Sequence, residues 1–152
     1  MTVLGIDTGT NGGLTFLGED CMIKAIQIMP LISDFPDLTG VTHCFVEKAQ
    51  TMSKNGKPQG AKSNFTTGQR LGELLGFMAA KKIPVSLVHP RTWQAKLLGS
   101  KFAAGDSKKK AYEVARQLWP NESFLPTPRC RKFHDGLVDS ALLALYGKRY
   151  LL

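Results

Sequence analysis

The sequence predicts an α/β fold, in which a mixed five-stranded sheet is flanked by helices. Residues 2–7 are apolar at nearly every position, as in a strand buried in the middle of a sheet. Turn-forming residues then divide residues 8–29 into short strands that can pair as an antiparallel meander. Further along, helical patterns alternate with a short strand, which is typical of an α/β arrangement. The chain of 152 residues is long enough for one domain, which we expect to span 1–152.

The first three strands are expected to be antiparallel, because tight turns separate them. Asn11-Gly12-Gly13 predicts a hairpin turn after the first strand, and Glu19-Asp20 predicts a second turn. A crossover containing several prolines, at 30–40, then leads into a strand that should lie parallel to the first. The predicted strands are residues 2–7, 14–17, 22–29, 41–47 and 85–88.

The helices are predicted from their start and stop signals. Ser63-Asn64 is a start signal for a helix over about 65–81. Pro90 suits the first position of a helix that continues over 91–97. Asp106-Ser107 can cap a helix over 108–119, which Pro120 ends. The last helix is predicted over 134–147.

Charge is distributed unevenly along a chain whose net charge is +8. Residues 1–47 hold one basic residue and six acids, whereas residues 48–134 hold seventeen basic residues and four acids. A basic central region beside a local group of acids indicates a polyanionic substrate, although a merely basic surface is the alternative.

Cysteine usage and hydropathy suggest where the protein works. Cys21, Cys44 and Cys130 are widely spaced and contain no C-x-x-C pair, so neither a disulfide framework nor a zinc site is expected. Cys21 and Cys44 lie in apolar runs and are expected to be small buried hydrophobes. The sequence has no signal peptide pattern and no apolar run of membrane-spanning length. We therefore expect a soluble protein of a reducing cytoplasm.

Acidic residues occur at the ends of apolar elements, and this is the most informative feature of the chain. Asp7 closes the first strand, Glu47 closes the strand at 41–47, and Asp135 and Asp139 lie four residues apart at the start of the last helix. Buried carboxylates are rare unless they are paired or bind metal. Converging carboxylates are the ligands that Mg²⁺ prefers, and two Mg²⁺ ions suit phosphodiester hydrolysis. The pattern therefore predicts a metal-dependent phosphodiesterase site.

Each acidic residue also has a simpler interpretation. Asp7 could cap the Thr8-Gly9 turn, and Glu47 could pair with Lys48 or a nearby arginine. Asp135 could serve as a helix cap. The neighbouring His134 is either a general acid or a side chain that points to solvent.

Three acidic motifs together resemble those of RuvC-type Holliday junction resolvases, of the ribonuclease H-like superfamily. They are Gly5-Ile6-Asp7-Thr8-Gly9-Thr10, Phe45-Val46-Glu47-Lys48 and 134–142, and their order and spacing cover essentially the whole chain. The short length is similar to that of phage versions. The resemblance implies a ribonuclease H-like fold and a homodimeric crossover junction endodeoxyribonuclease of the bacterial or phage-infected host cytoplasm. It also implies two Mg²⁺ per site, with Mn²⁺ as an alternative ion, and paired nicking of branched DNA.

The resemblance assigns metal-binding and catalytic roles to four carboxylates. Asp7, Glu47 and Asp139 match the family's positions directly. Family members usually place the fourth ligand three residues before the last Asp, and this chain has Gly136 there. Asp135 is the substitute, since it lies on the same helical face as Asp139.

Basic residues and glycines predict how DNA and a second subunit would bind. A glycine every four residues, at Gly68, Gly72 and Gly76, provides a smooth helix face for a dimer interface or for packing on the chain's own sheet. Met52 and Phe65 could wedge into an opened junction, with a place in the helix core as the alternative for Phe65. The candidate DNA-binding residues, from the basic loops and from the run that opens a helix, are Lys54, Lys57, Lys62, Arg70, Lys108, Lys109, Lys110, Arg129, Arg131 and Lys132.

Three other functions compete with this interpretation. Another ribonuclease H-like nuclease would cleave RNA–DNA hybrids, flaps or forks. A non-enzymatic DNA-binding protein would depend on its lysines and not on its carboxylates. The motif at 5–10 also resembles the first phosphate loop of actin-like and sugar-kinase-like ATPases, but 152 residues leave no room for their second lobe.

Overall fold

The computed structural model describes residues 1–48, 57, 60–99 and 106–152. Its five strands form one mixed sheet in the order β3-β2-β1-β4-β5. The antiparallel pairs are β1–β2 and β2–β3, and the parallel pairs are β1–β4 and β4–β5. This topology confirms the predicted fold class and the parallel pairing of the first and fourth strands. The strands are β1 (Thr2–Asp7), β2 (Gly13–Leu17), β3 (Ile23–Ile28), β4 (Val41–Glu47) and β5 (Val85–Val88).

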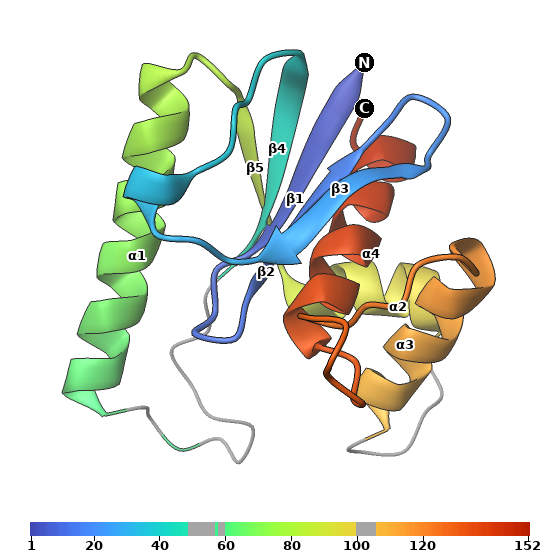
Figure 1. Ribbon diagram of the computed structural model, residues 1–152. Coiled ribbons are helices and arrows are strands. Elements are labelled where there is room, and N and C mark those ends of the chain that lie inside the picture. Colours follow the sequence, from blue (N-terminus) through green and yellow to red (C-terminus); the bar gives the residue numbers. More distant parts are fainter. Residues whose placement is uncertain (49–56, 58–59, 100–105) are drawn as a thin grey trace.

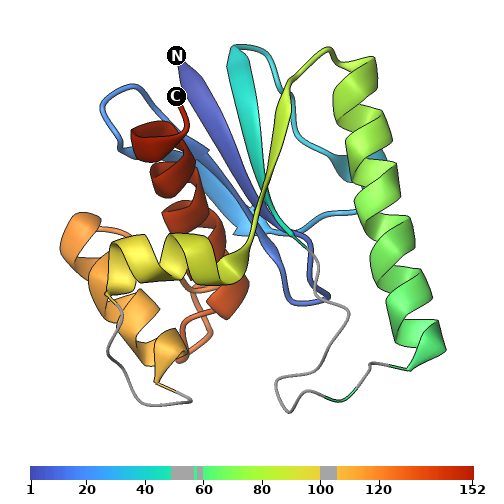
Figure 2. The same ribbon diagram turned by 180° about the vertical axis from the view of Figure 1, so that it is seen from behind.

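Helices cover both faces of the sheet. Figure 1 shows α1 on one side and α2, α3 and α4 on the other, and Figure 2 shows the same three layers from behind. A short 3-10 helix, η1, lies in the crossover between β3 and β4. The helices are α1 (Ala61–Ala80), α2 (Pro90–Leu98), α3 (Ser107–Leu118) and α4 (Asp135–Tyr150), with η1 at Ile32–Asp34.

Several predicted boundaries were wrong, although every predicted element exists. Helix α1 begins at Ala61, ahead of its predicted start signal, and its N-cap is Gly60, which offers no side-chain hydrogen bond. Asp106 precedes α3 but its side chain makes no capping hydrogen bond. Helix α4 ends at Tyr150, beyond the predicted end at 147, although its buried residues end at Gly147.

Side chains alternate along the strands and divide the core into two clusters. Leu4 and Ile6 of β1 pack with α1, whereas Val3 packs in the cluster that contains α4. In β4 the pattern repeats, since Val46 joins the α1 cluster and Phe45 joins the α4 cluster. Because side chains alternate with a period of two, Asp7 and Glu47, the last residues of β1 and β4, point toward α4.

Helix α4 lies unusually close to the central strand. A Cβ atom at Gly5 would collide with the backbone of Ser140 and with Ala144, so only glycine permits this approach. The hydroxyl groups of Thr15 and Ser140 form a buried hydrogen bond of 2.8 Å that joins β2 to the same helix. Close packing and this polar contact fix the position of α4 over the carboxyl end of β1.

The glycines of α1 face outward and not toward the sheet. A Cβ atom at Gly68, Gly72 or Gly76 would have no neighbour within 4 Å. The alternative prediction, that this stripe packs on the chain's own sheet, is therefore wrong. Leu74 and Met78, on the opposite face of the helix, are buried against the sheet. The side chain of Phe65 is 73% exposed, so its predicted place in the helix core is also wrong.

The three cysteines are free. Cys44 is buried as expected, but Cys21 is only half-buried because it occupies the β2–β3 turn, with a φ of 59°. No helix in the described ranges is both long and apolar enough to span a membrane.

Candidate active site

Asp7 lies at the carboxyl end of β1, where the turn into β2 begins. Its Oδ1 atom accepts a hydrogen bond of 3.0 Å from the amide of Gly9, so the predicted capping role is real. Burial raises the pKa of Asp7 above its ordinary value, and the Gly9 hydrogen bond opposes this rise. One carboxylate oxygen is thus fixed by the turn, and Oδ2 is left for other ligands.

Glu47 ends the neighbouring parallel strand, and its partner is a tryptophan. The indole Nε1 of Trp93 donates a hydrogen bond of 2.9 Å to Oε2 of Glu47. Trp93 is fully buried in α2, so it holds the carboxylate in a fixed orientation. The predicted pairing with Lys48 is not formed. Burial, together with the charge of Asp7, raises the pKa of Glu47 to about 7.

Asp139 lies on α4 and faces the ends of both strands. Burial raises its pKa well above the ordinary value, and the charges of Glu47, Asp7 and Asp135 raise it further. Each of these carboxylates therefore affects the ionisation of Asp139. The fold brings together four acids from β1, β4 and α4, although these three elements are distant from one another in the sequence.

Asp135 is the first residue of α4 and forms an ion pair with Lys108 of α3. The hydrogen bond to Asp135 raises the pKa of Lys108, and the charges of Asp139 and Asp7 add to this effect. Lys108 is thus the member of the lysine run that reaches the acidic site. The helix macrodipole disfavours a cation at the start of α3, and the contact with the acidic site explains why Lys108 is nevertheless found there.

The structure explains why residue 136 is a glycine. The hairpin turn between β1 and β2 rests directly on the first turn of α4, and a Cβ atom at 136 would collide with the backbone of Asn11 and Gly12. Gly13 makes the reciprocal contact, since its own Cβ would meet the backbone of Gly136. No side chain fits at 136, so a fourth ligand must come from another position.

His134 is the N-cap residue of α4, but its imidazole does not cap the helix. Its Nδ1 atom is buried and has no hydrogen-bond partner among the described residues, so this nitrogen does not point to solvent. A positive charge on His134 lowers the pKa of Asp7, which places the ring near the site. The imidazole is a polar group available to a ligand that binds there.

The donor set suits a hard cation, because it consists of carboxylate oxygens. Among the described residues, no three His, Cys, Asp or Glu side chains are close enough together to form a complete ligand set. Within this set, Asp135 forms its ion pair with Lys108. Burial raises the pKa values of Asp7, Glu47 and Asp139, and the charges of neighbouring carboxylates raise them further.

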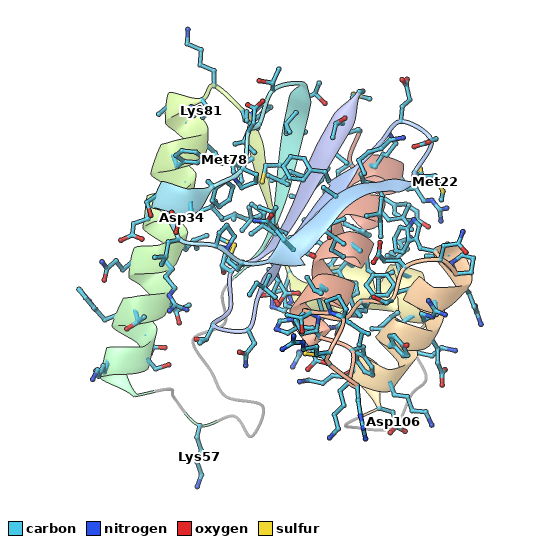
Figure 3. The ribbon with its side chains drawn as sticks, in the orientation of Figure 1. Met22, Asp34, Lys57, Met78, Lys81 and Asp106 are labelled. Carbon is cyan, nitrogen blue, oxygen red and sulfur yellow. The ribbon has the colours of Figure 1, made fainter. Side chains whose placement is uncertain are left out.

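Most of the other predicted DNA-binding residues that the structure describes are exposed. Figure 3 labels Lys57, which lies toward the N-terminal end of α1, and this is also the end at which β1 and β4 finish. Arg70 lies further along α1 and donates a hydrogen bond of 3.2 Å to Thr10 in the turn after Asp7. Lys54 and Met52 lie outside the described residues. The exposed positions are Lys57, Lys62, Arg70, Lys108, Lys109, Arg129, Arg131 and Lys132, and Lys110 is half-buried.

Sequence reasoning missed the role of Trp93. A signal was present, because α2 begins directly after β5, which lies parallel to β4. A residue in the first turn of such a helix lies at the same sheet edge as Glu47. A pattern of burial alone, however, does not reveal that an indole N–H is directed at a carboxylate.

We expect the stability of the metal-free protein to fall as pH rises. A raised carboxyl pKa means that the folded state binds more protons than the unfolded state between the two pKa values. For Glu47 this window runs from its usual 4.5 to about 7, so the free energy of unfolding decreases across it and stays low above it. Thermal unfolding in EDTA at about pH 5 and about pH 7.5 measures this slope.

Mg²⁺ should reverse that slope, because it binds the deprotonated carboxylates of the folded state. The increase in Tm on adding Mg²⁺ should be larger at the higher pH, and Glu47→Gln should flatten the pH dependence in EDTA. A metal-free Tm that rises over this pH interval would contradict the expected coupling.

Known structures support the fold independently of the site. The chain is similar to Thermus thermophilus RuvC in complex with a Holliday junction substrate, with a TM-score of 0.67 and 18% identity over 99% of this chain and 94% of that one. A second structure of T. thermophilus RuvC gives a TM-score of 0.67 and 20% identity, with 99% and 95% of the two chains covered. No protein-family model and no curated protein matches the sequence.

Proposed function

We propose that this chain, which has the RuvC-type fold of the ribonuclease H-like superfamily, is a metal-dependent endonuclease that resolves four-way DNA junctions by paired nicking. The observation that carries the proposal is the convergence of Asp7, Glu47 and Asp139 at one edge of the sheet. The uneven charge of the chain supports a nucleic acid substrate, because Arg70 and Lys108 contact the turn after Asp7 and Asp135 respectively, and Lys57 lies at the same end of the molecule.

Two Mg²⁺ ions held by Asp7, Glu47, Asp139 and Asp135 would supply an activated water and stabilise the leaving oxygen. The chain's own residues prepare that site. The Gly9 amide and the Trp93 indole each hold one carboxylate oxygen, which fixes the orientation of Asp7 and of Glu47. Because burial raises the pKa values of these carboxyl groups, cation binding at the site would be coupled to proton release.

Lys108 has a distinct role in this proposal. Its ammonium group neutralises Asp135 and interacts with Asp139 and Asp7. A phosphate that enters the site would offer Lys108 a second anionic partner and free Asp135 to bind metal. The remaining exposed lysines and arginines would contact phosphates further along the DNA arms.

The direct test compares a mobile synthetic four-way junction with linear duplex DNA and an RNA–DNA hybrid, in Mg²⁺ and in EDTA. We expect paired, metal-dependent nicks in the junction alone. Cleavage of the hybrid alone would instead identify a ribonuclease H. Tight junction binding without cleavage in Mg²⁺ or Mn²⁺ would leave a non-enzymatic DNA-binding protein.

Symmetric nicking of two strands needs two active sites, and the outer face of α1 is our candidate for the dimer interface. Gly68, Gly72 and Gly76 leave open space on this face, and exposed Phe65 lies beside them. Three glycines in a helix interior cost about 1 kcal/mol each relative to alanine. Close approach of a second α1 would offset this cost. A two-fold axis would place the same glycines on both sides of the contact.

Gly72→Glu should convert the dimer to a monomer, because a charged side chain would separate the two helices. The measurement is the molar mass in sedimentation equilibrium, with circular dichroism to check the fold. Gln117→Glu is the matched control, because it makes the same charge change on the exposed face of α3, on the other side of the sheet. A Gly72→Glu variant that still dimerises would place the interface elsewhere.

A further inference from the structure

A cavity of about 550 Å³ lies at the end of the sheet opposite to the carboxylates. Its walls are the crossover around η1 and the C-terminal end of α1, where Figure 3 labels Lys81. Val41, the first residue of β4, lines the cavity, and Glu47 ends the same strand. At about 3.3 Å per residue, roughly 20 Å separate these two positions. The volume is within the roughly 300–1,000 Å³ of ligand-binding pockets, so the cavity is a candidate site distinct from the acidic one.

Lys82, in the cavity wall, occupies a backbone position at which glycine is usual. Its φ is 57°, in the left-handed region, directly after α1. The amides of Lys82 and Ile83 donate to the carbonyls of Ala79 and Met78, which is the Schellman arrangement that ends many helices. A lysine costs more than a glycine in this conformation, so the backbone alone does not account for its presence. A strained residue with a charged side chain in a cavity wall points to a binding role.

The polar part of the lining is rich in hydrogen-bond donors. Within the described ranges, the side chains of Lys82 and Ser33 form neither a hydrogen bond nor an ion pair. Asp37 is the one carboxylate in the described lining, and its Oδ1 accepts hydrogen bonds of 3.1 Å and 2.8 Å from the amide and the hydroxyl of Thr39. These hydrogen bonds lower the pKa of Asp37, and the charge of Lys81 lowers it further. Two ammonium groups beside an occupied carboxylate suit an anionic ligand.

The apolar part of the lining suits an apolar side chain better than a nucleotide base. The rings of Phe35 and Phe77 pack on each other, with their centroids 5.1 Å apart. The ammonium group of Lys81 lies over the ring of Phe77, 5.6 Å from its centroid. A base stacks on an open ring face, and the ring of Phe77 already has these two neighbours. A peptide side chain needs only apolar contact, which Leu38 and Ile83 of the lining also provide.

We propose that this cavity binds an acidic peptide segment of a partner protein, with its carboxylates at Lys81 and Lys82 and an apolar side chain against Phe35. Charge complementarity favours this occupant over a second copy of the chain, whose net charge is +8. The cavity is at the far end from the acidic edge, so the partner and a DNA substrate can be bound together. The inference does not depend on the proposed nuclease function. Where that function holds, such a partner would bring the enzyme to its DNA.

The test measures the fluorescence anisotropy of a labelled peptide of four Glu-Phe repeats in EDTA, without DNA and with a saturating four-way junction. We expect saturable binding in both conditions, and much weaker binding of the peptide that carries Gln in place of Glu. Lys82→Gly should weaken peptide binding by about fivefold, because it removes one partly exposed charge contact. Lys82→Arg keeps the charge and should bind the peptide as the wild type does. Lys96→Gln, at an exposed position of α2, is the charge-matched control.

Thermal unfolding separates loss of binding from loss of folding. Glycine adopts the left-handed conformation without steric cost, so the Tm of Lys82→Gly should equal or exceed that of the wild type. Peptide binding that is unaffected by Lys82→Gly, equal binding of the Gln peptide, or displacement of the peptide by junction DNA would overturn the proposal. Competition by a free mononucleotide, but not by the unlabelled peptide, would assign the cavity to a nucleotide and overturn it as well. Peptide binding by a protein that neither binds nor nicks the junction would support the cavity while contradicting the proposed function.

Discussion

Asp7→Asn and Asp139→Asn are each expected to lower junction cleavage by about 10³-fold or more, because each removes a charge that holds Mg²⁺ at the reacting phosphate. Junction binding should persist in both variants, since the phosphate contacts come from lysines and arginines. Single-turnover nicking in Mg²⁺ and a gel-shift assay in EDTA measure the two quantities separately.

The stability of these two variants distinguishes loss of chemistry from loss of folding. Burial raises the pKa values of the remaining carboxyl groups, and repulsion between carboxylates raises them further. Asparagine is neutral, so it removes that repulsion. The metal-free Tm at about pH 7.5 should therefore equal or exceed that of the wild type. Asp34→Asn is the matched control, because Figure 3 places Asp34 on the outer side of the sheet, near α1 and away from α4. Full cleavage by Asp7→Asn would refute the carboxylate site.

The second large effect concerns Gly136, the position at which the resemblance to RuvC-type resolvases led us to expect a metal ligand. Gly136→Asp should not strengthen metal binding but should destabilise the fold, because its Cβ collides with the backbone of Asn11 and Gly12. A clash with backbone is not relieved by rotating a side chain. We expect a loss of about 3 kcal/mol or more, which for this length lowers Tm by roughly 10 °C.

Gly136→Ala separates the effect of bulk from the effect of charge. It adds only a methyl group and should reproduce most of the loss of Tm measured by scanning calorimetry. Gly60→Ala is the matched control, since a Cβ atom there meets nothing within 4 Å and its φ is −59°. If Gly136→Asp were as stable as the wild type and bound Mg²⁺ more tightly, the hairpin could not rest on α4 as described.

Much of the fold could be predicted from local patterns. The apolar run at 2–7 identified the central strand, and the turn residues after Asp7 identified the hairpin. Element boundaries were less predictable. Helix α1 begins four residues earlier than expected, and no capping side chain marks its start.

The candidate site was only partly predictable. The acids stood out because each ends or begins an apolar element, and alternation along β1 and β4 placed Asp7 and Glu47 on one face. Their partners were not predictable, since Trp93 and Lys108 are distant in sequence and lie in separate helices. The outward direction of the glycine stripe also depended on which face of α1 met the sheet.

The sequence by itself determined which residues carry charge at the strand ends and which helix faces are smooth, because these follow from residue type and local period. Only the tertiary structure decided that Lys108 neutralises Asp135, that Trp93 orients Glu47, and that the hairpin occupies the space a side chain at 136 would need. Those contacts join segments that are far apart along the chain. Their geometry depends on how closely α4 approaches β1. The need for glycine at that contact can be recognised only when both packed surfaces are known.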